Sequence, residues 1–312
     1  MNRKTQYLGL LLLSLLIFPP AYARQRLNGK CGSKTYWQFE PETGALLITG
    51  EGAINEFKDG RRCPWNKYKG DITSVRIEEG VTSIGCFSFA GCIKLTSVEL
   101  PASLTNISYR AFFYCIKLNS IALQQRLKTI GCSAFEQCVS LSAITIPSNV
   151  TEIGGAAFNT CEALYEVVLP ENLKILQTSL FFRCYHLQHV ILPKNLEEIG
   201  WATFGYCIEL STIELPSSLK RIHMEAFFGC EDLKAITIPQ GVTQIGECAF
   251  CDCLSLTSID IPQSVRRIDK HAFNCPNLID ASLPAKFQKQ GRRLFGKRYK
   301  QVRIHQVPDK NE

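Results

Sequence analysis

Methionine, tryptophan and histidine are scarce in this chain of 312 residues, which holds only two, three and five of them. No histidine has a Cys or Ser partner at the spacing of a known catalytic family, and the motifs of phosphate-binding loops, zinc proteases and serine hydrolases are absent. Charged residues make up 20% and glycines number 21, which excludes a coiled coil and collagen. The hydrophobic share of 46% excludes a disordered chain. We therefore expect a folded protein that is not an enzyme and carries no cofactor.

Long apolar runs are also missing, apart from one short run at the N-terminus. There Arg3 and Lys4 precede the apolar stretch Leu8–Phe18, and an A-x-A pattern follows at 21–23. Eleven apolar residues are too few to cross about 30 Å of hydrocarbon, and no later segment approaches the length of a membrane span. The pattern predicts a cleaved signal peptide at 1–23. We expect an exported protein, at the cell surface, outside the cell or in the periplasm, with no transmembrane segment in the mature chain.

Acidic residues are rare in the C-terminal segment 286–312, which holds nine Lys and Arg against two acids. Since the whole chain is +7 and residues 1–23 contribute +2, residues 24–285 carry 7 − 2 − 7 = −2. This nearly neutral body argues against a nucleic-acid partner, which would require a basic face. The basic segment is either a solvated end or a site for acidic polysaccharide, anionic lipid or acidic protein. Its candidate residues are Arg292, Arg293, Lys297, Arg298 and Lys300.

A repeat of 23 residues dominates the sequence. Nine of the 18 phenylalanines lie on it, at Phe89, Phe112, Phe135, Phe158, Phe181, Phe204, Phe227, Phe250 and Phe273. Cysteines follow the same period, at Cys92, Cys115, Cys138, Cys161, Cys184, Cys207, Cys230 and Cys253, and then at Cys275 after a spacing of 22. A Leu, an alternating apolar pair, a Pro in most units and a second apolar pair complete each unit.

This spacing predicts a stack of about nine coils. The alternating pair places apolar side chains on one side of a short strand, and the Pro that follows lacks an N–H and ends the pairing. A single unit of this size cannot bury its apolar side alone, whereas stacked units share a continuous core. We therefore expect a repeat solenoid with parallel strands and short irregular or helical turns.

The unit I-G-x-x-A-F-x-x-C-x-x-L-x-x-I-x-I-P, present at 130–147 and 245–262, resembles the BspA-type leucine-rich repeat of bacterial and some protist surface proteins. The resemblance implies a right-handed solenoid over 72–284. It also implies that the segment 24–71, with Trp37, Leu46–Gly50 and Pro64-Trp65, is the family's N-terminal cap. Members of the family are implicated in adhesion to host matrix proteins and other cells.

The two ends of the stack depart from the repeat. In the N-terminal segment, Trp37 and Phe39 alternate before a turn-rich stretch, and Leu46 and Ile48 alternate after it, which predicts a β-hairpin over the first coil. At the other end, 285–312 is predicted to be a basic C-terminal cap or tail, with a last edge strand near Val302.

The 15 cysteines would suggest a disulfide framework in an exported protein. The ladder from Cys92 to Cys275 is better explained as a row of small apolar core residues, with bridges between adjacent coils as the alternative. Cys31 and Cys63 in the cap are a possible disulfide. Cys248, Cys251 and Cys253 do not predict a metal site, because Cys253 belongs to the ladder and no nearby His completes a set of four zinc ligands.

Outward strand positions in most coils are small or polar, but the two central coils differ. Exposed aromatic and apolar side chains on a polar face are candidate interaction anchors, although isolated surface residues can look the same. The candidates are Tyr165, Val168, Tyr185, His186, His189 and Ile191. We expect an interaction module with a protein partner, namely a host matrix or cell-surface protein by family resemblance. Binding of glycan or the anionic cell envelope through the basic segment is the alternative.

Overall fold

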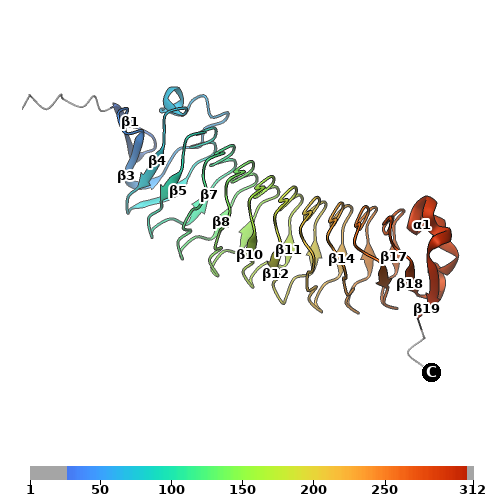
Figure 1. Ribbon diagram of the computed structural model, residues 1–312. Coiled ribbons are helices and arrows are strands. Elements are labelled where there is room, and N and C mark those ends of the chain that lie inside the picture. Colours follow the sequence, from blue (N-terminus) through green and yellow to red (C-terminus); the bar gives the residue numbers. More distant parts are fainter. Residues whose placement is uncertain (1–26, 308–312) are drawn as a thin grey trace, which may run out of the picture.

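The computed structural model describes residues 27–307 and shows an elongated solenoid with a cap at each end (Figure 1). The predicted signal peptide at 1–23 lies outside these residues. Successive coils repeat every 23 residues and carry parallel strands, as the sequence predicts, so equivalent residues lie side by side along the body. Each coil has a first segment that is a strand in some coils, a short second strand, and a turn that contains the Phe and the Cys of the repeat.

The N-terminal cap is a three-stranded antiparallel sheet. The predicted hairpin is confirmed: β2 (Lys34–Glu40) pairs with β3 (Ala45–Ala53), and Trp37 lies opposite Ile48. A further strand that the sequence analysis missed, β1 (Leu27–Lys30), pairs with β2. The long β3 then pairs in parallel with the first strands of the solenoid, β4 (Ser74–Ile77) and β5 (Val81–Ile84). The cap is therefore continuous with the solenoid core.

The first strand row is formed by the alternating apolar pair of each unit. After β4 it contains β6 (Ser97–Glu99), β10 (Glu166–Val168), β12 (His189–Ile191), β16 (Ser258–Asp260) and β18 (Asp280–Leu283). Between β6 and β10 only isolated bridges join Ser120, Ala143 and Glu166. The coils at 211–215 and 234–238 have no regular strand in this row, although Ile213 and Ile236 remain buried. The predicted strand is thus present in some coils, whereas the inward apolar position persists in all of them.

The second strand row was not predicted as strand. It begins with β5 and continues with two-residue strands at the L-x-x-I-G part of each unit. These are β7 (Asn106–Ile107), β8 (Thr129–Ile130), β9 (Glu152–Ile153), β11 (Ile175–Leu176), β13 (Glu198–Ile199), β14 (Arg221–Ile222), β15 (Gln244–Ile245) and β17 (Arg267–Ile268). One residue of each pair is buried and the other faces outward, so this row forms a second wall of the core.

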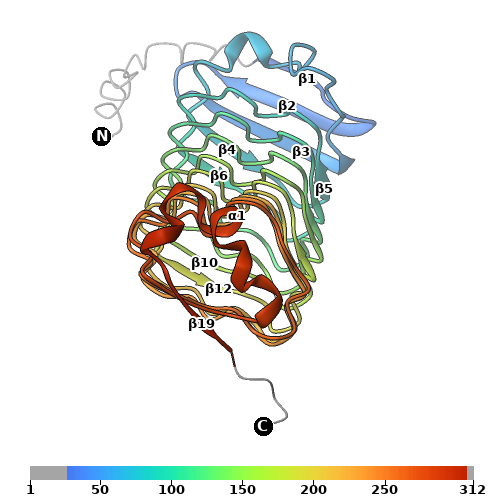
Figure 2. The same cartoon turned by 90° about the vertical axis from the view of Figure 1, so that its right-hand side faces the viewer.

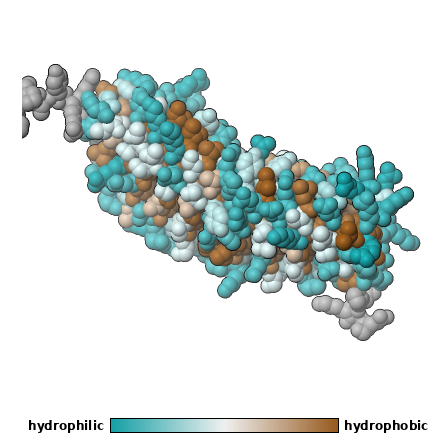
Figure 3. All heavy atoms as spheres, in the orientation of Figure 1, coloured by the Kyte–Doolittle hydropathy of each residue, from teal (hydrophilic) through white to brown (hydrophobic). Residues whose placement is uncertain are grey.

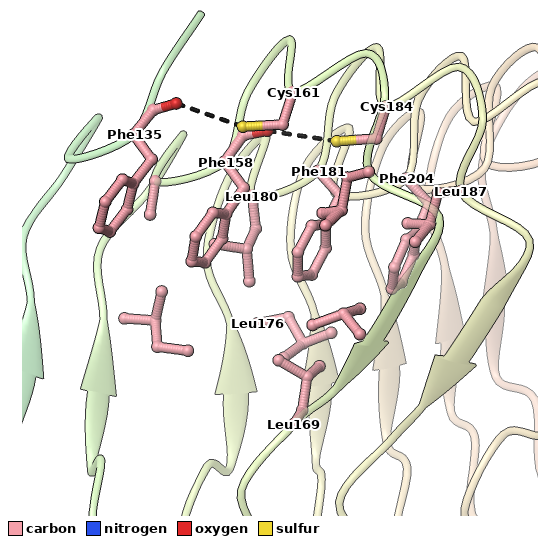
Figure 4. Close-up of a cluster of buried hydrophobic side chains, with 14 of the residues drawn as sticks. Phe135, Phe158, Cys161, Leu169, Leu176, Leu180, Phe181, Cys184, Leu187 and Phe204 are labelled. Atoms are coloured by element: carbon pink, nitrogen blue, oxygen red, sulfur yellow. Dashed lines mark hydrogen bonds between the residues drawn. The ribbon is translucent and has the colours of Figure 1, made fainter. Parts of the chain in front are cut away.

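The Phe-containing turns stack the rings of the nine phenylalanines into one column, and Figure 4 shows the part formed by Phe135, Phe158, Phe181 and Phe204. Neighbouring ring centroids lie 5.2–5.7 Å apart. Trp65 of the N-terminal cap stacks on Phe89 at 5.7 Å, and Phe295 of the C-terminal cap contacts Phe273 at 6.4 Å. Both caps therefore cover the ends of the aromatic column and keep it from solvent.

Each of these turns uses left-handed backbone at residues other than glycine. Ala156 and Thr160 flank Phe158 with φ of 56° and 58°. Such values are uncommon for residues with a side chain. Here the N–H groups of Ala156, Phe158 and Thr160 all donate to carbonyls of the next coil, at 2.8, 3.1 and 2.7 Å. These inter-coil hydrogen bonds hold the turn in a conformation that a single unit would not maintain.

The C-terminal cap is folded onto the last coil and covers the end of the stack (Figure 2). It consists of the 3₁₀ segment η2 (Ala285–Gln290), the short helix α1 (Gly291–Phe295), η3 (Gly296–Gln301) and the strand β19 (Arg303–Gln306). β19 pairs in parallel with β18, as the sequence predicts for this end. Another short 3₁₀ turn, η1 (Asn66–Tyr68), lies in the N-terminal cap. None of the helices in the described part of the chain is long and apolar enough to cross a membrane.

Candidate partner-binding face

The central strand patch, formed by Tyr165, Val168, His189 and Ile191, lies where two first-row strands pair. β10 and β12 form a two-stranded parallel sheet in which Glu166 is opposite His189 and Val168 is opposite Ile191. The pleat turns these residues outward, while Val167 points into the core. The sheet register therefore brings residues from two separate repeats onto one surface.

Tyr165 and His189 form the polar half of this patch. The Tyr165 hydroxyl lies 3.1 Å from Nε2 of His189, and the two rings meet edge to face with centroids 5.1 Å apart. This contact fixes the orientation of two exposed side chains that would otherwise be free to rotate. A side chain held in this way would lose less conformational entropy if a partner bound to it.

Val168 and Ile191 form the apolar half. Their exposed fractions are 45% and 56%, and Tyr165 beside them is 44% exposed. Figure 3 shows one face of the molecule, on which hydrophobic residues form patches among hydrophilic ones. Two exposed branched aliphatic side chains directly opposite each other, next to an aromatic ring, offer apolar area that a partner can bury.

The other two candidates, Tyr185 and His186, lie in the turn that precedes β12. His186 is exposed, and its Nδ1 lies 2.7 Å from Oε1 of Glu209 in the next coil. Gln188 donates to the other oxygen of the same carboxylate at 2.8 Å. The hydrogen bonds from Gln188 and His186 lower the pKa of Glu209. The structure thus joins His186 to a neighbouring carboxylate, whereas Tyr185 is half-buried in the turn.

Gln188 and Glu209 were missed by the sequence analysis. Glu209 follows His186 by 23 residues and therefore occupies the same repeat position in the next coil. Comparing the charges of adjacent coils at that position would have found it. Gln188 lies 21 residues before Glu209 and therefore occupies a different repeat position, which no column of equivalent residues can reveal. Together with His186, these two residues form a polar border beside the central strand patch.

The basic residues of the C-terminal cap all lie on its outer surface. Leu294 and Phe295 are buried, while the five candidates Arg292, Arg293, Lys297, Arg298 and Lys300 are exposed. Two of them also support the cap: Arg298 donates to the carbonyl of Pro276 at 3.0 Å, and Arg293 donates to the side chain of Gln290 at 2.7 Å. Residues 285–307 contain eight Lys and Arg and no Asp or Glu. The cap is therefore a folded surface of one charge sign.

The ladder cysteines are buried, and from Cys115 onward their thiols have a polar partner that the sequence did not predict. Each thiol from Cys115 to Cys253 donates to the carbonyl of the Phe 26 residues earlier, at 3.2–3.3 Å; two of these bonds, from Cys161 and Cys184, are drawn in Figure 4. Cys275 donates to the carbonyl of Phe250 at 2.8 Å. The thiols are free, so adjacent coils are joined here by hydrogen bonds.

The possible disulfide between Cys31 and Cys63 is not formed in this structure. Both thiols are free and buried. Cys31 donates to the hydroxyl of Thr35 at 3.6 Å, while Cys63 donates to the carbonyl of Ser88 at 3.3 Å, beside the indole N–H of Trp65 at 2.8 Å. Burial raises the pKa of Cys31 to about 11 and that of Cys63 to about 12. The Cys31 thiol thus forms a hydrogen bond within the cap, whereas the Cys63 thiol forms one from the cap to the first coil.

Metal binding was not expected from the sequence. Among residues 27–307, no group of three or more His, Cys, Asp or Glu side chains is arranged to hold a metal ion. A surface hollow at the N-terminal end of the first strand row is lined by Arg76, Glu79 and Glu99. There the Glu79 carboxylate already accepts the backbone N–H groups of Ala102 and Ser103.

Comparison with solved structures finds other leucine-rich repeat proteins. A leucine-rich repeat protein of T. pallidum is 29% identical, with 56% of this chain and 86% of that one covered and a TM-score of 0.44. A leucine-rich repeat protein from Bacteroides ovatus is 24% identical, with 90% and 100% covered and a TM-score of 0.41. A leucine rich cell surface protein from Faecalibacterium prausnitzii is 22% identical, with 91% and 96% covered and a TM-score of 0.36.

No curated protein matches the chain. The model of the BspA type leucine rich repeat region, with six repeat copies, matches in three overlapping segments, at 67–188, 112–218 and 197–311. These segments run without a gap from the N-terminal cap through every coil of the Phe column to the basic cap. Because they cover well over half of the sequence, the protein belongs to the BspA-type leucine-rich repeat family.

Proposed function

We propose that this protein is an exported interaction module, displayed at the cell surface, that binds a protein partner through the central strand patch. Its family supports a repeat interaction module as the general role. Host matrix proteins and surface proteins of other cells are the proposed partner class. The module works without catalysis: it presents side chains at fixed positions on a rigid stack of coils.

The paired exposure of Val168 and Ile191 beside the Tyr165–His189 contact is the observation that supports this site. An exposed tyrosine held in place next to aliphatic side chains has the composition of a binding hot spot. A protein partner fits this chemistry better than a sugar or a nucleic acid, because two adjacent branched aliphatic groups gain mainly from burial against other apolar groups. The polar border of His186, Gln188 and Glu209 would surround the contact.

A triple variant tests the site directly. Tyr165→Ala, His189→Ala and Ile191→Ala together should weaken binding of the full chain to immobilised matrix proteins and to whole cells by at least about tenfold, as expected for loss of a hot spot. The matched control is the triple variant Thr96→Ala, Ser97→Ala and Glu99→Ala. These residues occupy the equivalent repeat positions near the N-terminal end, and all three are exposed. Equal binding by both triple variants would refute the proposed site.

Display at the surface has its own test. Protease treatment of intact source cells should remove the protein, and fractionation should find the remainder in the envelope or the medium. Full protection from the protease without release into the medium would contradict surface display, whatever the binding assays show.

Binding to an anionic polysaccharide through the C-terminal cap is a second candidate. The folded, uniformly basic surface at 285–307 favours it. Deleting the cap is not a clean test, because Phe295 covers the end of the Phe column. Substituting Arg292, Lys297 and Lys300 by Gln keeps the buried residues, and this variant should lose salt-dependent binding to sulfated polysaccharide. Lys117→Gln, Arg126→Gln and Lys128→Gln remove the same charge from exposed positions on the body and should leave that binding unchanged.

A further inference from the structure

One turn of the solenoid contains two cysteines in a C-x-x-C arrangement, Cys248-Ala249-Phe250-Cys251. The N–H of Cys251 donates to the carbonyl of Cys248 at 3.0 Å, which closes a four-residue turn. A hydrogen-bonded turn of this kind brings its first and last Cα atoms within about 7 Å. Disulfides join Cα atoms about 4.4–6.8 Å apart, so the backbone already has a suitable span.

The two cysteines lie in the same hydrogen-bonded turn and differ in exposure. Cys251 is buried and also donates to the carbonyl of His271 in the next coil, at 3.0 Å. Cys248 is half-exposed, at a left-handed position of the turn with φ of 52°. The Cys248 thiol can therefore react with a reagent from solvent, and the Cys251 thiol lies in the same turn.

The remaining cysteines lack this combination. The ladder thiols are buried, and those from Cys115 onward donate hydrogen bonds to Phe carbonyls. An oxidant in solvent therefore cannot reach them. Cys132 is exposed but has Tyr109 and Gly155 at the same position of the two adjacent coils, and the half-exposed Cys86 has Glu56 and Tyr109 as its neighbours. In the described part of the chain, Cys248 and Cys251 are thus the one turn pair in which an accessible thiol has a neighbour ready to react.

We propose that Cys248 and Cys251 form a disulfide by exchange with a small disulfide oxidant such as oxidised glutathione. The Cys248 thiolate attacks one sulfur of the oxidant, forms a mixed disulfide and releases one glutathione thiolate. The Cys251 thiolate then attacks the Cys248 sulfur, forms the intramolecular S–S bond and releases the second glutathione. The two cysteines lose two electrons and two protons, and the oxidant is reduced to two thiols.

The surroundings of the two thiols determine how fast the disulfide exchange runs and in which compartment the bond can form. Burial raises the pKa of both thiols, so the reactive thiolates are scarce at neutral pH and the exchange should accelerate as the pH rises. Such a pair suits a structural bond made once in an oxidising compartment rather than a rapid redox switch. Formation in the cell rests on the export that we propose above, whereas formation in the test tube does not.

The test uses the full chain, purified with reductant, freed of it and exposed to oxidised glutathione. After acid quenching and alkylation, the peptide that holds Cys248 and Cys251 should be lighter by two hydrogen atoms and carry alkyl groups on neither cysteine. Fragmentation should place the bond between these two residues. Cys248→Ser, at a half-exposed position, should abolish this species, and the matched variant Cys132→Ser should leave it unchanged.

Three results would overturn the proposal. The first is complete alkylation of Cys248 and Cys251 under conditions in which the exposed Cys132 has taken up glutathione. The second is a bond from Cys251 to Cys253 or to another molecule. The third is protection from alkylation without loss of hydrogen and reversed by a chelator, which would indicate a metal ion. Circular dichroism and a second variant, Cys251→Ser, distinguish loss of the bond from loss of the fold. None of these outcomes depends on surface display.

Discussion

The turn side and the first strand row of the solenoid use the same 23-residue period in opposite ways. On the turn side every coil repeats the same Phe and Cys, all of them buried and in register. On the first strand row the outward residues change from coil to coil, from Ser97 and Glu99 in β6 to His189 and Ile191 in β12. The repeated side holds the coils together, and the variable side is free to carry recognition.

The two sides also differ in how a residue is stabilised. Phe158 contacts the equivalent rings of both neighbouring coils, at 5.5 and 5.7 Å, so its packing is shared along the stack. The Ile191 side chain contributes less to the packing between coils, because it is 56% exposed on a short two-stranded sheet. Substitutions should therefore separate stability from binding according to the side on which they fall.

The largest effect is expected in the middle of the Phe column. Phe158→Ala should lower the free energy of unfolding by about 3–5 kcal/mol, because it removes a buried ring and leaves a cavity between two coils. Denaturant titration followed by circular dichroism measures this change. Val168→Ala, on the outward side of β10, should stay within about 0.5 kcal/mol of the wild type. Similar losses of unfolding free energy in both variants would mean that the turn side does not contribute more to stability than the first strand row.

A smaller effect should show whether the ladder thiols act as donors or only as apolar fillers. Cys161→Ala removes both the sulfur and the hydrogen bond to the carbonyl of Phe135, and should cost about 1–2 kcal/mol. Cys161→Ser keeps a donor at the same place, so its loss should be smaller. Denaturant titration of the two variants side by side decides the question. A less stable Ser variant would show that apolar packing alone explains the cysteines.

The period, the Phe column and the N-terminal hairpin could be predicted from the sequence because each depends on a strong repeated pattern. The second strand row could not, since two-residue strands such as β13 are too short to show a period of two. The fold of the C-terminal cap was missed for a related reason. Its short helical segments are stabilised by packing, as when Phe295 contacts Phe273, rather than by their own propensity.

The candidate site was partly visible in the sequence. Tyr165, Val168, His189 and Ile191 stood out because they break the polar pattern of their repeat positions, and the structure places them side by side. The contact between Tyr165 and His189 was not predictable, because these residues occupy different positions of the unit. Ion pairs such as Glu198–Arg221 join the same position of adjacent coils and could have been found by comparing charges at that repeat position. This ion pair offers the finest test of the comparison between rows.

The smallest effect concerns Glu198, on the outward side of the second strand row. Its carboxylate accepts a hydrogen bond from Arg221, which pairs with it across neighbouring strands, and lies 2.8 Å from Nε2 of His223. The hydrogen bond from Arg221, aided by His223, lowers the pKa of Glu198. The ionised form is therefore favoured in the folded state. Its stabilisation is fully present above the ordinary Glu pKa of about 4.3 and is lost as the pH falls through the lower folded value.

Glu198→Gln should accordingly lower the melting temperature at pH 7 by about 2 °C or less, and this difference should shrink as the pH falls below about 4.3 and the wild-type carboxylate becomes protonated. Glu152→Gln is the matched control, because Glu152 occupies the same repeat position two coils earlier and is exposed. Thermal melts of both variants and the wild type are recorded at pH 7 and at a series of lower pH values. Subtracting the shift of the Glu152 variant from that of the Glu198 variant removes the contribution of the other carboxylates. A loss in the Glu198 variant that does not shrink as the pH falls would show that packing at this position, rather than charge, stabilises the second strand row.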